Sequence, residues 1–195
     1  MKSILLVEDD RLVAHALAEA LSGAGYRVTP ARTVAGGLGQ AQQGHFDLMI
    51  FDIGLPDGSG LDLARQLREA KHPSPFIFLT AYQDEAVVQA GIALGAYSYL
   101  VKPVLAHQLL PLVASALAAL AREAENAARL RAAIDSNRTI NAAAGLLAGR
   151  SGGTPEEAFE VLRRYARDRR LKVEGVAAEV LAGRLDDGEL IRRGG

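Results

Sequence analysis

The stretch "FDIGLPDGSGLDL", residues 51–63, decides how the first half of the chain is interpreted. An apolar run, residues 48–51, ends on a carboxylate at Asp52, and the loop that follows is rich in glycine. Glycine offers no side chain that could shield a charge. Because open α/β sheets place their chemistry at the carboxyl ends of strands, Asp52 is a candidate functional residue.

Residues 3–104 alternate short apolar runs with stretches in which apolar residues recur at helical spacing. The apolar runs cover residues 4–7, 26–29, 48–51, 76–79 and 97–101. Repetition of a strand followed by a helix is typical of a parallel sheet with helices on both faces. The first half is therefore predicted to be an α/β domain with a doubly wound, (βα)5 parallel sheet.

From about residue 105 the strand pattern stops and a heptad pattern begins. Its apolar positions, interrupted only by Arg131, define an apolar seam: Leu110, Val113, Leu117, Leu120, Ala124, Ala127 and Ile134. The seam predicts a long coiled-coil-like helix, residues 105–137, that continues from the last helix of the first domain. It also predicts a homodimer through residues 110–134. The alternative is a solvated linker helix.

The last third of the chain is predicted to form a small three-helix bundle together with the long helix. Thr154 and Glu157 have the spacing of a capping box, and Pro155 suits the first helical position. Two apolar faces follow: Ala158, Val161, Leu162, Tyr165 and Ala166 on one helix, and Val173, Val176, Ala177, Val180 and Leu181 on the next. Residues 185–195 are expected to be a disordered tail.

The composition limits the classes of function. Apolar residues make up 49% of the chain, and the absence of cysteine excludes disulfides and thiolate chemistry. No segment resembles a signal peptide or a membrane span, so a cytoplasmic protein without a membrane partner is expected. Residues 1–104 carry 8 basic and 11 acidic side chains, whereas residues 129–184 carry 11 and 7. The mildly basic second half permits nucleic-acid binding.

Side chains that can carry chemistry follow four of the predicted strands. Glu8 and Asp9 follow the first strand, Asp52 ends the third, Thr80 ends the fourth and Lys102 follows the fifth. Three acids at one sheet edge repel one another and raise each other's pKa values unless a cation intervenes. Hard oxygen ligands suit Mg²⁺. The pattern therefore predicts Mg²⁺ as a cofactor at this edge.

Four motifs in order, "LLVEDD", "FDIGLPDGSG", "LTAY" and "YLVKP", resemble the receiver domain of two-component response regulators. The predicted domain covers residues 1–120. The resemblance implies that Asp52 accepts a phosphoryl group from a sensor histidine kinase. It also implies that Mg²⁺ is held by Glu8, Asp9, Asp52 and the backbone carbonyl of Gly54. No separate catalytic domain is expected, so the chain is not predicted to be an enzyme.

The same resemblance gives roles to three further positions. Thr80 and Lys102 are expected to bind the phosphoryl oxygens, around which phosphoryl transfer needs fixed positive charge. Tyr99 matches the switch aromatic, which turns inward when Thr80 moves toward the phosphate. Read alone, Lys102 would be a surface lysine and Tyr99 a core residue. The Lys102–Pro103 peptide bond is expected to be cis, and Gly54 leaves one side of the pocket bare, which leaves the phosphoryl lifetime open.

The segment "RTINAAAGLLAGRSGGTPEEAFEVLRRYARDRRLKVEGVAAEVL" resembles the ANTAR domain, an RNA-binding output module, over residues 129–184. It departs from the family at Ala144, where a lysine is usual. The resemblance implies that RNA hairpins in transcript leaders are partners. Candidate contacts are Arg138, Arg150, Arg163, Arg164, Arg167, Arg170 and Lys172, and Tyr165 is a candidate for stacking on a base. Pairs such as Glu160–Arg164 on a solvated helix face are the alternative.

Two functions of different classes remain open. The first is a response regulator that is phosphorylated on Asp52 and acts as an RNA-binding antitermination regulator. The alternative is a receiver-controlled protein-interaction or dimerisation module that binds no RNA. A DNA-binding output is less favoured, because no recognition helix follows a tight turn as in a helix-turn-helix.

Overall fold

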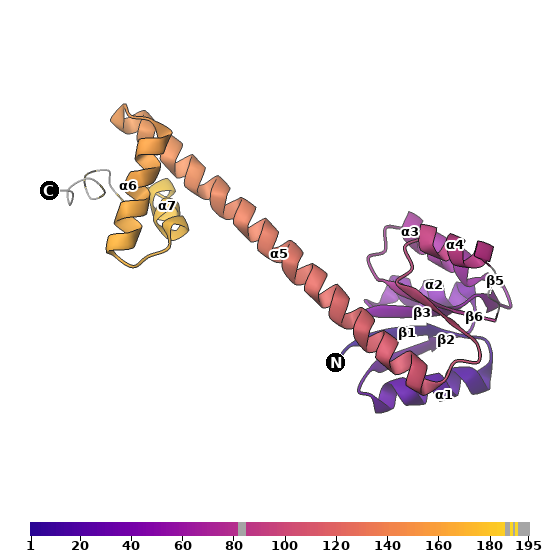
Figure 1. Cartoon of the computed structure of the whole chain (residues 1–195). Coiled ribbons are helices and arrows are strands. Elements are labelled where there is room, and N and C mark those ends of the chain that lie inside the picture. Colours follow the sequence, from indigo (N-terminus) through magenta and orange to yellow (C-terminus); the bar gives the residue numbers. More distant parts are fainter. Residues whose placement is uncertain (82–84, 186–187, 189, 191–195) are drawn as a thin grey trace. The chain divides into compact units, whose positions relative to one another are not determined.

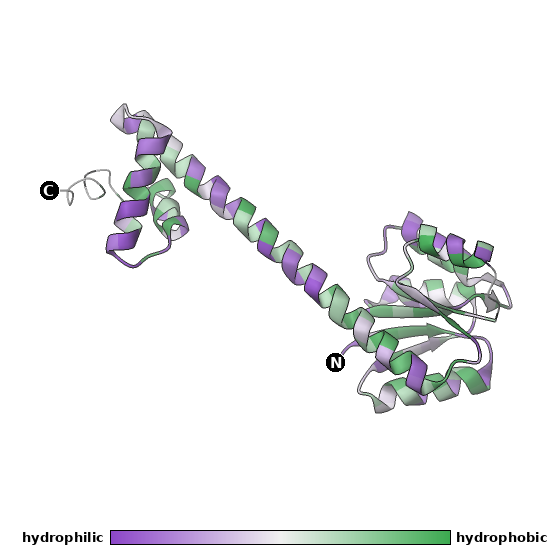
Figure 2. Ribbon diagram, in the orientation of Figure 1, coloured by the Kyte–Doolittle hydropathy of each residue, from purple (hydrophilic) through white to green (hydrophobic). Residues whose placement is uncertain are grey.

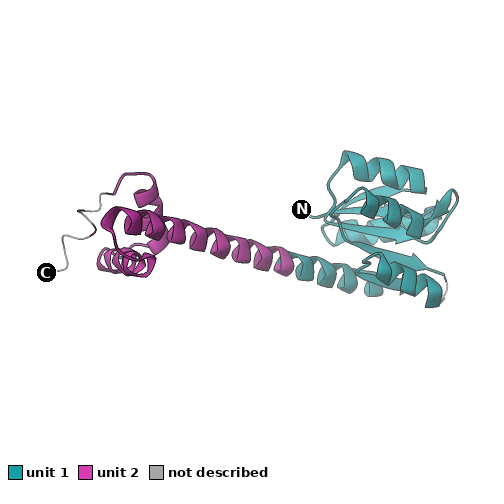
Figure 3. Ribbon diagram, turned by 90° about the horizontal axis from the view of Figure 1, so that it is seen from above, with its two compact units in different colours: residues 1–121 teal, residues 122–195 magenta. Residues whose placement is uncertain are grey.

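A computed structural model describes residues 1–81, 85–185, 188 and 190 of the chain. The chain divides into two compact units, residues 1–121 and residues 122–195 (Figure 3). No helix among the described residues combines the length and the apolar character that crossing a membrane requires. Each unit has its own core, so each is described by itself.

The first unit is built on a five-stranded parallel sheet with the strand order β2-β1-β3-β6-β7. The predicted doubly wound α/β class is confirmed. The strands are β1 (Ser3–Val7), β2 (Arg27–Ala31), β3 (Leu48–Asp52), β6 (Phe76–Thr80) and β7 (Ser98–Val101) (Figure 1). A short antiparallel pair that the sequence did not reveal, β4 (Gly54–Leu55) and β5 (Gly58–Ser59), lies in the glycine-rich loop.

Helices cover both faces of this sheet. On one face, α1 (Arg11–Gly23) and the first turns of α5 (Ala106–Ser151) pack against Ile4, Leu6, Ile50 and Ile77. On the other face, α2 (Val34–Gln43) and α3 (Gly60–Glu69) pack against alternate residues of the same strands, with α4 (Glu85–Ala93) beside them (Figure 1). The central strands are apolar along their length because both of their faces are covered (Figure 2).

The periodicity did not locate α2, which carries three glycines in ten residues. Glycine weakens an isolated helix, but here close packing requires it. A Cβ on Gly37 would lie 2.9 Å from the Leu63 side chain on α3 and 3.1 Å from the Val7 side chain. Gly37 therefore trades helix propensity for a close approach of α2 to the sheet and to α3.

The second unit joins the C-terminal turns of α5 to α6 (Pro155–Asp168) and α7 (Val173–Leu181). The capping box is present, with Thr154 and Glu157 each accepting a backbone hydrogen bond from the other. The core consists of Ala143, Ala144, Leu147, Ala148, Ala158, Leu162, Tyr165, Ala166, Val176, Ala177, Val180 and Leu190. The prediction that Leu181 points inward is wrong, because this side chain is 43% exposed.

The apolar seam of α5 has different surroundings along its length. Val113 and Leu117 are buried in the core of the first unit, where they join Leu109 and Ala116. Ala124, Ala127 and Ile134 are exposed. The first part of the seam therefore completes the core of its own unit, and only the part beyond residue 120 is available to a partner. Pro111 lies in the second turn of α5.

Part of the tail expected to be disordered is described. Leu190 is 4% exposed and belongs to the core of the second unit, and Leu185 packs against that core. Residues 186–187, 189 and 191–195 lie outside the described residues, as does the loop 82–84. The tail therefore supplies at least one core side chain, and the expectation of disorder does not hold for Leu190.

Asp57, in the glycine-rich loop, holds the start of α2. Its carboxylate accepts hydrogen bonds from the backbone N–H of Val34 at 2.7 Å and of Ala35 at 3.0 Å. Thr33 supplies acceptors for the next two N–H groups, those of Gly36 and Gly37. All four N–H groups of the first turn are thus satisfied. These backbone hydrogen bonds lower the pKa of Asp57 from its ordinary value of 3.8.

We predict that Asp57→Ala lowers the melting temperature of the first unit at neutral pH. Because the pKa of Asp57 is lowered in the folded state, its contribution is present above pH 3.8 and is lost as the pH falls through the lower folded value. The gap between variant and wild type should close in that acid range. Thermal unfolding followed by circular dichroism at several pH values measures it. Glu69→Ala, an exposed acid at the end of α3, is the control; an equal effect of both would contradict the prediction.

Candidate functional site

The register of the sheet places two of the predicted acids side by side. Val7 of β1 is paired with Phe51 of β3, so the residues that follow them, Glu8 and Asp52, lie next to each other at the carboxyl edge. Glu8 is fully buried and Asp52 is 5% exposed, whereas Asp9 is half-buried. Carboxylate oxygens of Glu8, Asp9 and Asp52 come within 4.8 Å of one another. The three predicted acids therefore form one cluster.

Lys102 joins the cluster from the end of β7. Its backbone N–H donates to the Thr80 carbonyl at 2.7 Å, which continues the pairing of β6 with β7. Its Nζ donates to Asp52 Oδ2 at 2.7 Å and to Glu8 Oε1 at 2.8 Å. The Lys102–Pro103 peptide bond is cis, as expected. One ammonium thus bridges two buried carboxylates.

The charges of this cluster depend on one another. Burial raises the pKa of Glu8, and the nearby Asp52 charge raises it further, while the hydrogen bond from Lys102 opposes both. Burial lowers the pKa of Lys102, but its hydrogen bonds to Asp52 and Glu8 outweigh that effect, so its pKa is raised. Lys102 therefore remains an ammonium at neutral pH. Two buried carboxylates without this partner would carry a large desolvation penalty.

The loop after Asp52 folds back tightly on the strand end. The Gly60 N–H donates to the Ile53 carbonyl at 3.1 Å, and a Cβ on Gly60 would lie 2.1 Å from the Asp52 carbonyl oxygen. Only glycine fits at this position. The Gly54 N–H donates to Asp52 Oδ1 at 3.2 Å, and a Cβ on Gly54 would meet no atom within 4 Å. The side of the pocket next to Gly54 is therefore open.

The acid cluster fits a divalent cation. Oε2 of Glu8 is buried and lies 2.7 Å from Lys102 Nζ, yet among the described residues it accepts no hydrogen bond. Asp9 adds a more exposed carboxylate, while Asp10 is occupied as the N-cap of α1 through the N–H groups of Leu12 and Val13. A buried oxygen with spare acceptor capacity and two further carboxylates are ligands that suit Mg²⁺.

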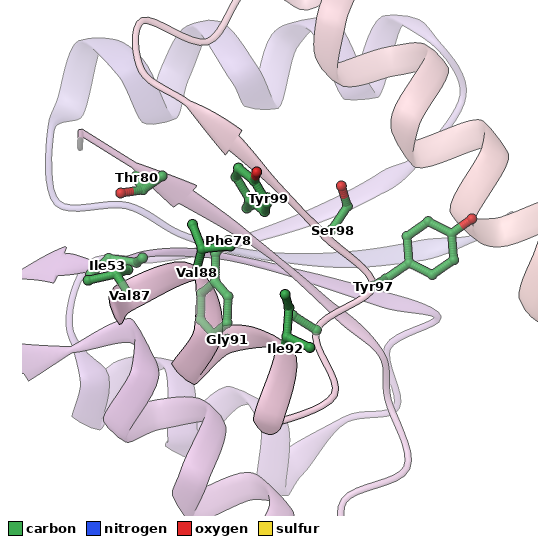
Figure 4. A pocket seen from close by; sticks show the side chains of 11 residues that line it. Ile53, Phe78, Thr80, Val87, Val88, Gly91, Ile92, Tyr97, Ser98 and Tyr99 are labelled. Atoms are coloured by element: carbon green, nitrogen blue, oxygen red, sulfur yellow. The ribbon is translucent and has the colours of Figure 1, made fainter. Parts of the chain in front are cut away.

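Thr80 and Tyr99 border a cavity next to the acid cluster. Thr80 is 3% exposed at the end of β6, and Tyr99, on β7, is 46% exposed. The cavity measures about 180 Å³, and its walls include Phe78, Val88 and Gly91 (Figure 4). Thr80 and Tyr99 line this cavity from the sheet and Val88 and Gly91 line it from α4, so space for a side-chain rearrangement exists beside both predicted switch residues.

The candidate RNA contacts all lie on the surface of the second unit. Arg138 and Arg150 belong to α5, Arg163, Arg164 and Arg167 to α6, Arg170 to the turn after it, and Lys172 precedes α7. The Glu160–Arg164 pair is not the one found: Glu160 contacts Arg163 at 3.4 Å. Ala144, which stands where the ANTAR family usually has a lysine, is buried in the core of the second unit.

The expectation for Tyr165 is wrong. This ring is 8% exposed, because it belongs to the core of the second unit. The Arg169 guanidinium lies over its outer side, 4.1 Å from the ring centroid. A base could not stack directly on Tyr165. The apolar spacing of α6 predicts that Tyr165 is buried. It does not predict the contact of Tyr165 with Arg169, four residues later.

The fold and the strand-end cluster define a response regulator receiver, and comparison with known proteins extends this to the whole chain. Residues 4–114 match the response regulator receiver domain family, and residues 128–181 match the ANTAR domain family. Neither is a catalytic domain. The chain therefore belongs to the response regulators that combine a receiver domain with a C-terminal ANTAR domain, as the sequence motifs indicated.

Individual relatives agree with this assignment. The transcriptional regulatory protein PdtaR of Mycobacterium tuberculosis is 31% identical over 191 residues, covering 92% of this chain and 89% of that protein. A CheY-like receiver domain from Methanospirillum hungatei has a TM-score of 0.61 at 30% identity, over 63% of this chain and 98% of its own. The response regulator TrrA of Thermotoga maritima, solved with Mg²⁺ and BeF, has a TM-score of 0.54 at 33% identity, over 60% and 99%.

We predict that Mg²⁺ raises the melting temperature of the first unit and that Glu8→Gln with Asp9→Asn removes this increase. A cation that binds only the folded state stabilises it by mass action, and it relieves the repulsion within the cluster. Thermal unfolding across a Mg²⁺ titration measures the effect. Asp47→Asn, an acid paired with Lys2 at the opposite end of β3, is the control. An unchanged Mg²⁺ response of the double variant would reject the site.

Proposed function

We propose that this chain is the response regulator of a two-component system, phosphorylated on Asp52 by a sensor histidine kinase, and that it acts as an RNA-binding antitermination regulator. The observation that carries the first part is the bridge from Lys102 to Asp52 and Glu8 at one sheet edge. The proposed extents are residues 1–120 for the receiver, 105–137 for the helical linker and 129–184 for the ANTAR domain.

The geometry supports phosphoryl transfer in a simple way. A carboxylate oxygen of Asp52 attacks the phosphorus of phosphohistidine, so a P–O bond forms as the P–N bond breaks and the electron pair leaves with the imidazole. Lys102, already 2.7 Å from Oδ2, remains beside the product and offsets the charge of the phosphoryl oxygens. Glu8, Asp9, Asp52 and the Gly54 carbonyl would hold Mg²⁺, which supplies further positive charge. TrrA, solved with Mg²⁺ and BeF, supports this assignment by analogy.

Thr80 and Tyr99 would report the phosphoryl group. Thr80 stands at the end of β6 beside the acid cluster, and the cavity next to it gives the Tyr99 ring a place to move (Figure 4). Movement of the Thr80 hydroxyl toward the phosphoryl oxygens would open the way for the ring. The Tyr99 ring is 46% exposed, so moving into the cavity would bury it. The open side at Gly54 admits water, which would shorten the life of the acyl phosphate.

The ANTAR match and the exposed cations of the second unit support RNA as the ligand of the output domain. Arginine and lysine bind phosphates through charge, so this binding weakens as salt rises. The candidates are unequal, since Arg163 is partly offset by Glu160 at 3.4 Å and Arg167 lies 4.0 Å from Asp168. Exposed ion pairs of this kind are weak, so both arginines can exchange their carboxylate for a phosphate.

We predict that a small phosphodonor with Mg²⁺ labels the wild type and tightens its binding to hairpins from transcript leaders, and that Asp52→Asn loses both effects. The amide oxygen of asparagine is not a competent nucleophile. Gel shifts at several salt concentrations measure binding, and affinity should fall steeply with salt. Asp57→Asn, an acid in the same loop, is the control for labelling. Undiminished labelling of Asp52→Asn would reject the site, and absence of any salt-dependent RNA binding would reject the output.

A specific observation also favours self-association. Ile134, in the apolar seam, and Leu130, which flanks the seam next to Arg131, are 48% and 63% exposed on one side of α5, and residues 121–135 are exposed throughout. An exposed heptad stretch of this kind is typical of a helix that pairs with a second copy. If no RNA binds, the protein-interaction alternative would rest on this stretch. Leu117, by contrast, is a poor probe of the dimer because it belongs to the receiver core.

We predict that Leu130→Glu with Ile134→Glu gives a folded monomer that still accepts phosphate at Asp52. Buried charges in a paired seam would oppose association, whereas on a solvated helix they cost almost nothing. Sedimentation with and without phosphodonor measures the assembly state. Asn126→Glu with Ala133→Glu places the same two charges on exposed positions outside the seam and should stay dimeric. Identical behaviour of the two variants would remove the dimer model.

A further inference from the structure

Arg169 contacts the ring and the hydroxyl of Tyr165 at the end of α6. Its guanidinium lies 4.1 Å from the centroid of the Tyr165 ring and donates a hydrogen bond through Nη1 to the Tyr165 hydroxyl. The ring itself is fixed, since it is 8% exposed and packs in the core with Leu162 and Ala166. A mobile surface arginine is thereby given one orientation by a buried aromatic ring.

The other side of this guanidinium is available. Arg169 is exposed, and its side chain has no further hydrogen bond or ion pair with any described residue. Tyr165 accounts for one N–H, which is directed at its hydroxyl, and the remaining donors have no partner among the described residues. Arginine usually donates such hydrogen bonds to carboxylates, but four of the N–H groups of Arg169 have no partner among the described residues. An exposed planar cation that is fixed through one N–H can offer its plane for stacking.

The neighbours of Arg169 make this surface basic and partly apolar. The α6–α7 turn, residues 169–172, also carries Arg170 and Lys172, and the last turn of α6 just before it carries Arg167 and one acid, Asp168. Leu171 in the same turn is 54% exposed. The opposite end of α6 is acidic, with Glu156, Glu157 and Glu160 near Arg164 along one shallow groove. A polyanion would therefore be favoured at the turn and disfavoured at the start of α6.

We propose that the Arg169 guanidinium, mounted on Tyr165, is the stacking platform for an unpaired base of the bound RNA, while the other cations of the α6–α7 turn contact the phosphates that flank it. The proposal rests on the proposed RNA-binding function. RNA is recognised mostly at unpaired bases, which stack on aromatic rings or on guanidinium planes. The exposed Leu171 adds an apolar edge beside the base. In this proposal the base stacks on Arg169, which covers Tyr165, and not on Tyr165 itself.

A double-mutant cycle tests this stack. The probe is a hairpin that full-length, phosphodonor-treated wild-type protein selects from a pool with randomised loops. Each unpaired loop nucleotide is then replaced in turn by an abasic one. Arg169→Lys keeps the charge but lacks the plane, and Arg129→Lys, on α5 and paired with Glu125, is the matched control. Tyr165→Phe keeps the ring and the core but removes the hydroxyl that orients Arg169.

We expect one abasic position to weaken wild-type binding about tenfold, within the range for loss of a stacked base, and to leave Arg169→Lys unchanged. Arg169→Lys should itself bind the intact hairpin about tenfold more weakly with the same salt slope. Arg129→Lys should show the full abasic effect, and Tyr165→Phe a smaller one than wild type. Circular dichroism checks that each variant is folded.

Two results would overturn the proposal, and they differ in meaning. If every abasic position costs Arg169→Lys as much as it costs the wild type, Arg169 does not stack on a base, although RNA binding stands. If the wild type selects no hairpin from the pool at any salt concentration, the RNA-binding function fails and the platform with it. In that case the exposed Leu130 and Ile134 become the basis for a protein-interaction role.

Discussion

The charge balance between Lys102 and the two buried carboxylates, Asp52 and Glu8, is the constraint on which the rest of the receiver depends. Three parallel strands must end at the same edge and in the observed register for one ammonium to reach both acids. A shift of one residue would turn each of these side chains to the other face of the sheet. The fully covered apolar strands hold that register, and the site is the consequence.

A single helix serves three environments. The residues of α5 near Leu117 complete the receiver core, those near Leu130 are exposed, and those near Leu147 belong to the core of the second unit. The apolar residues of α5 therefore belong to the receiver core, to an exposed stretch and to the core of the second unit in turn. Because α5 is one helix from Ala106 to Ser151, it is the element that, in the proposed function, would carry a phosphorylation signal to the second unit.

The second unit separates its charges along α6. Acids gather at the N-terminal end of the helix, where they favour its dipole and the capping box, and cations gather in the α6–α7 turn. The helix is thereby stabilised by the same distribution that directs a polyanion to one end. Packing of Tyr165 into the core contributes a second effect, because the buried ring orients the Arg169 guanidinium that covers it.

Local pattern was enough to predict the five strands, the chemical side chains at their ends, the capping box at Thr154 and the membership of two families, since periodicity, caps and motifs are properties of neighbouring residues. It failed for α2, where Gly37 is explained only by the approach of Leu63 and Val7, and for Leu117, Leu190 and Tyr165, whose neighbours come from elsewhere in the fold. Apolar residues at helical spacing show that one face of a helix must be buried, but they do not identify which other residues bury it. That choice, and with it the division of α5 and the contact of Arg169 with Tyr165, was made by the tertiary structure.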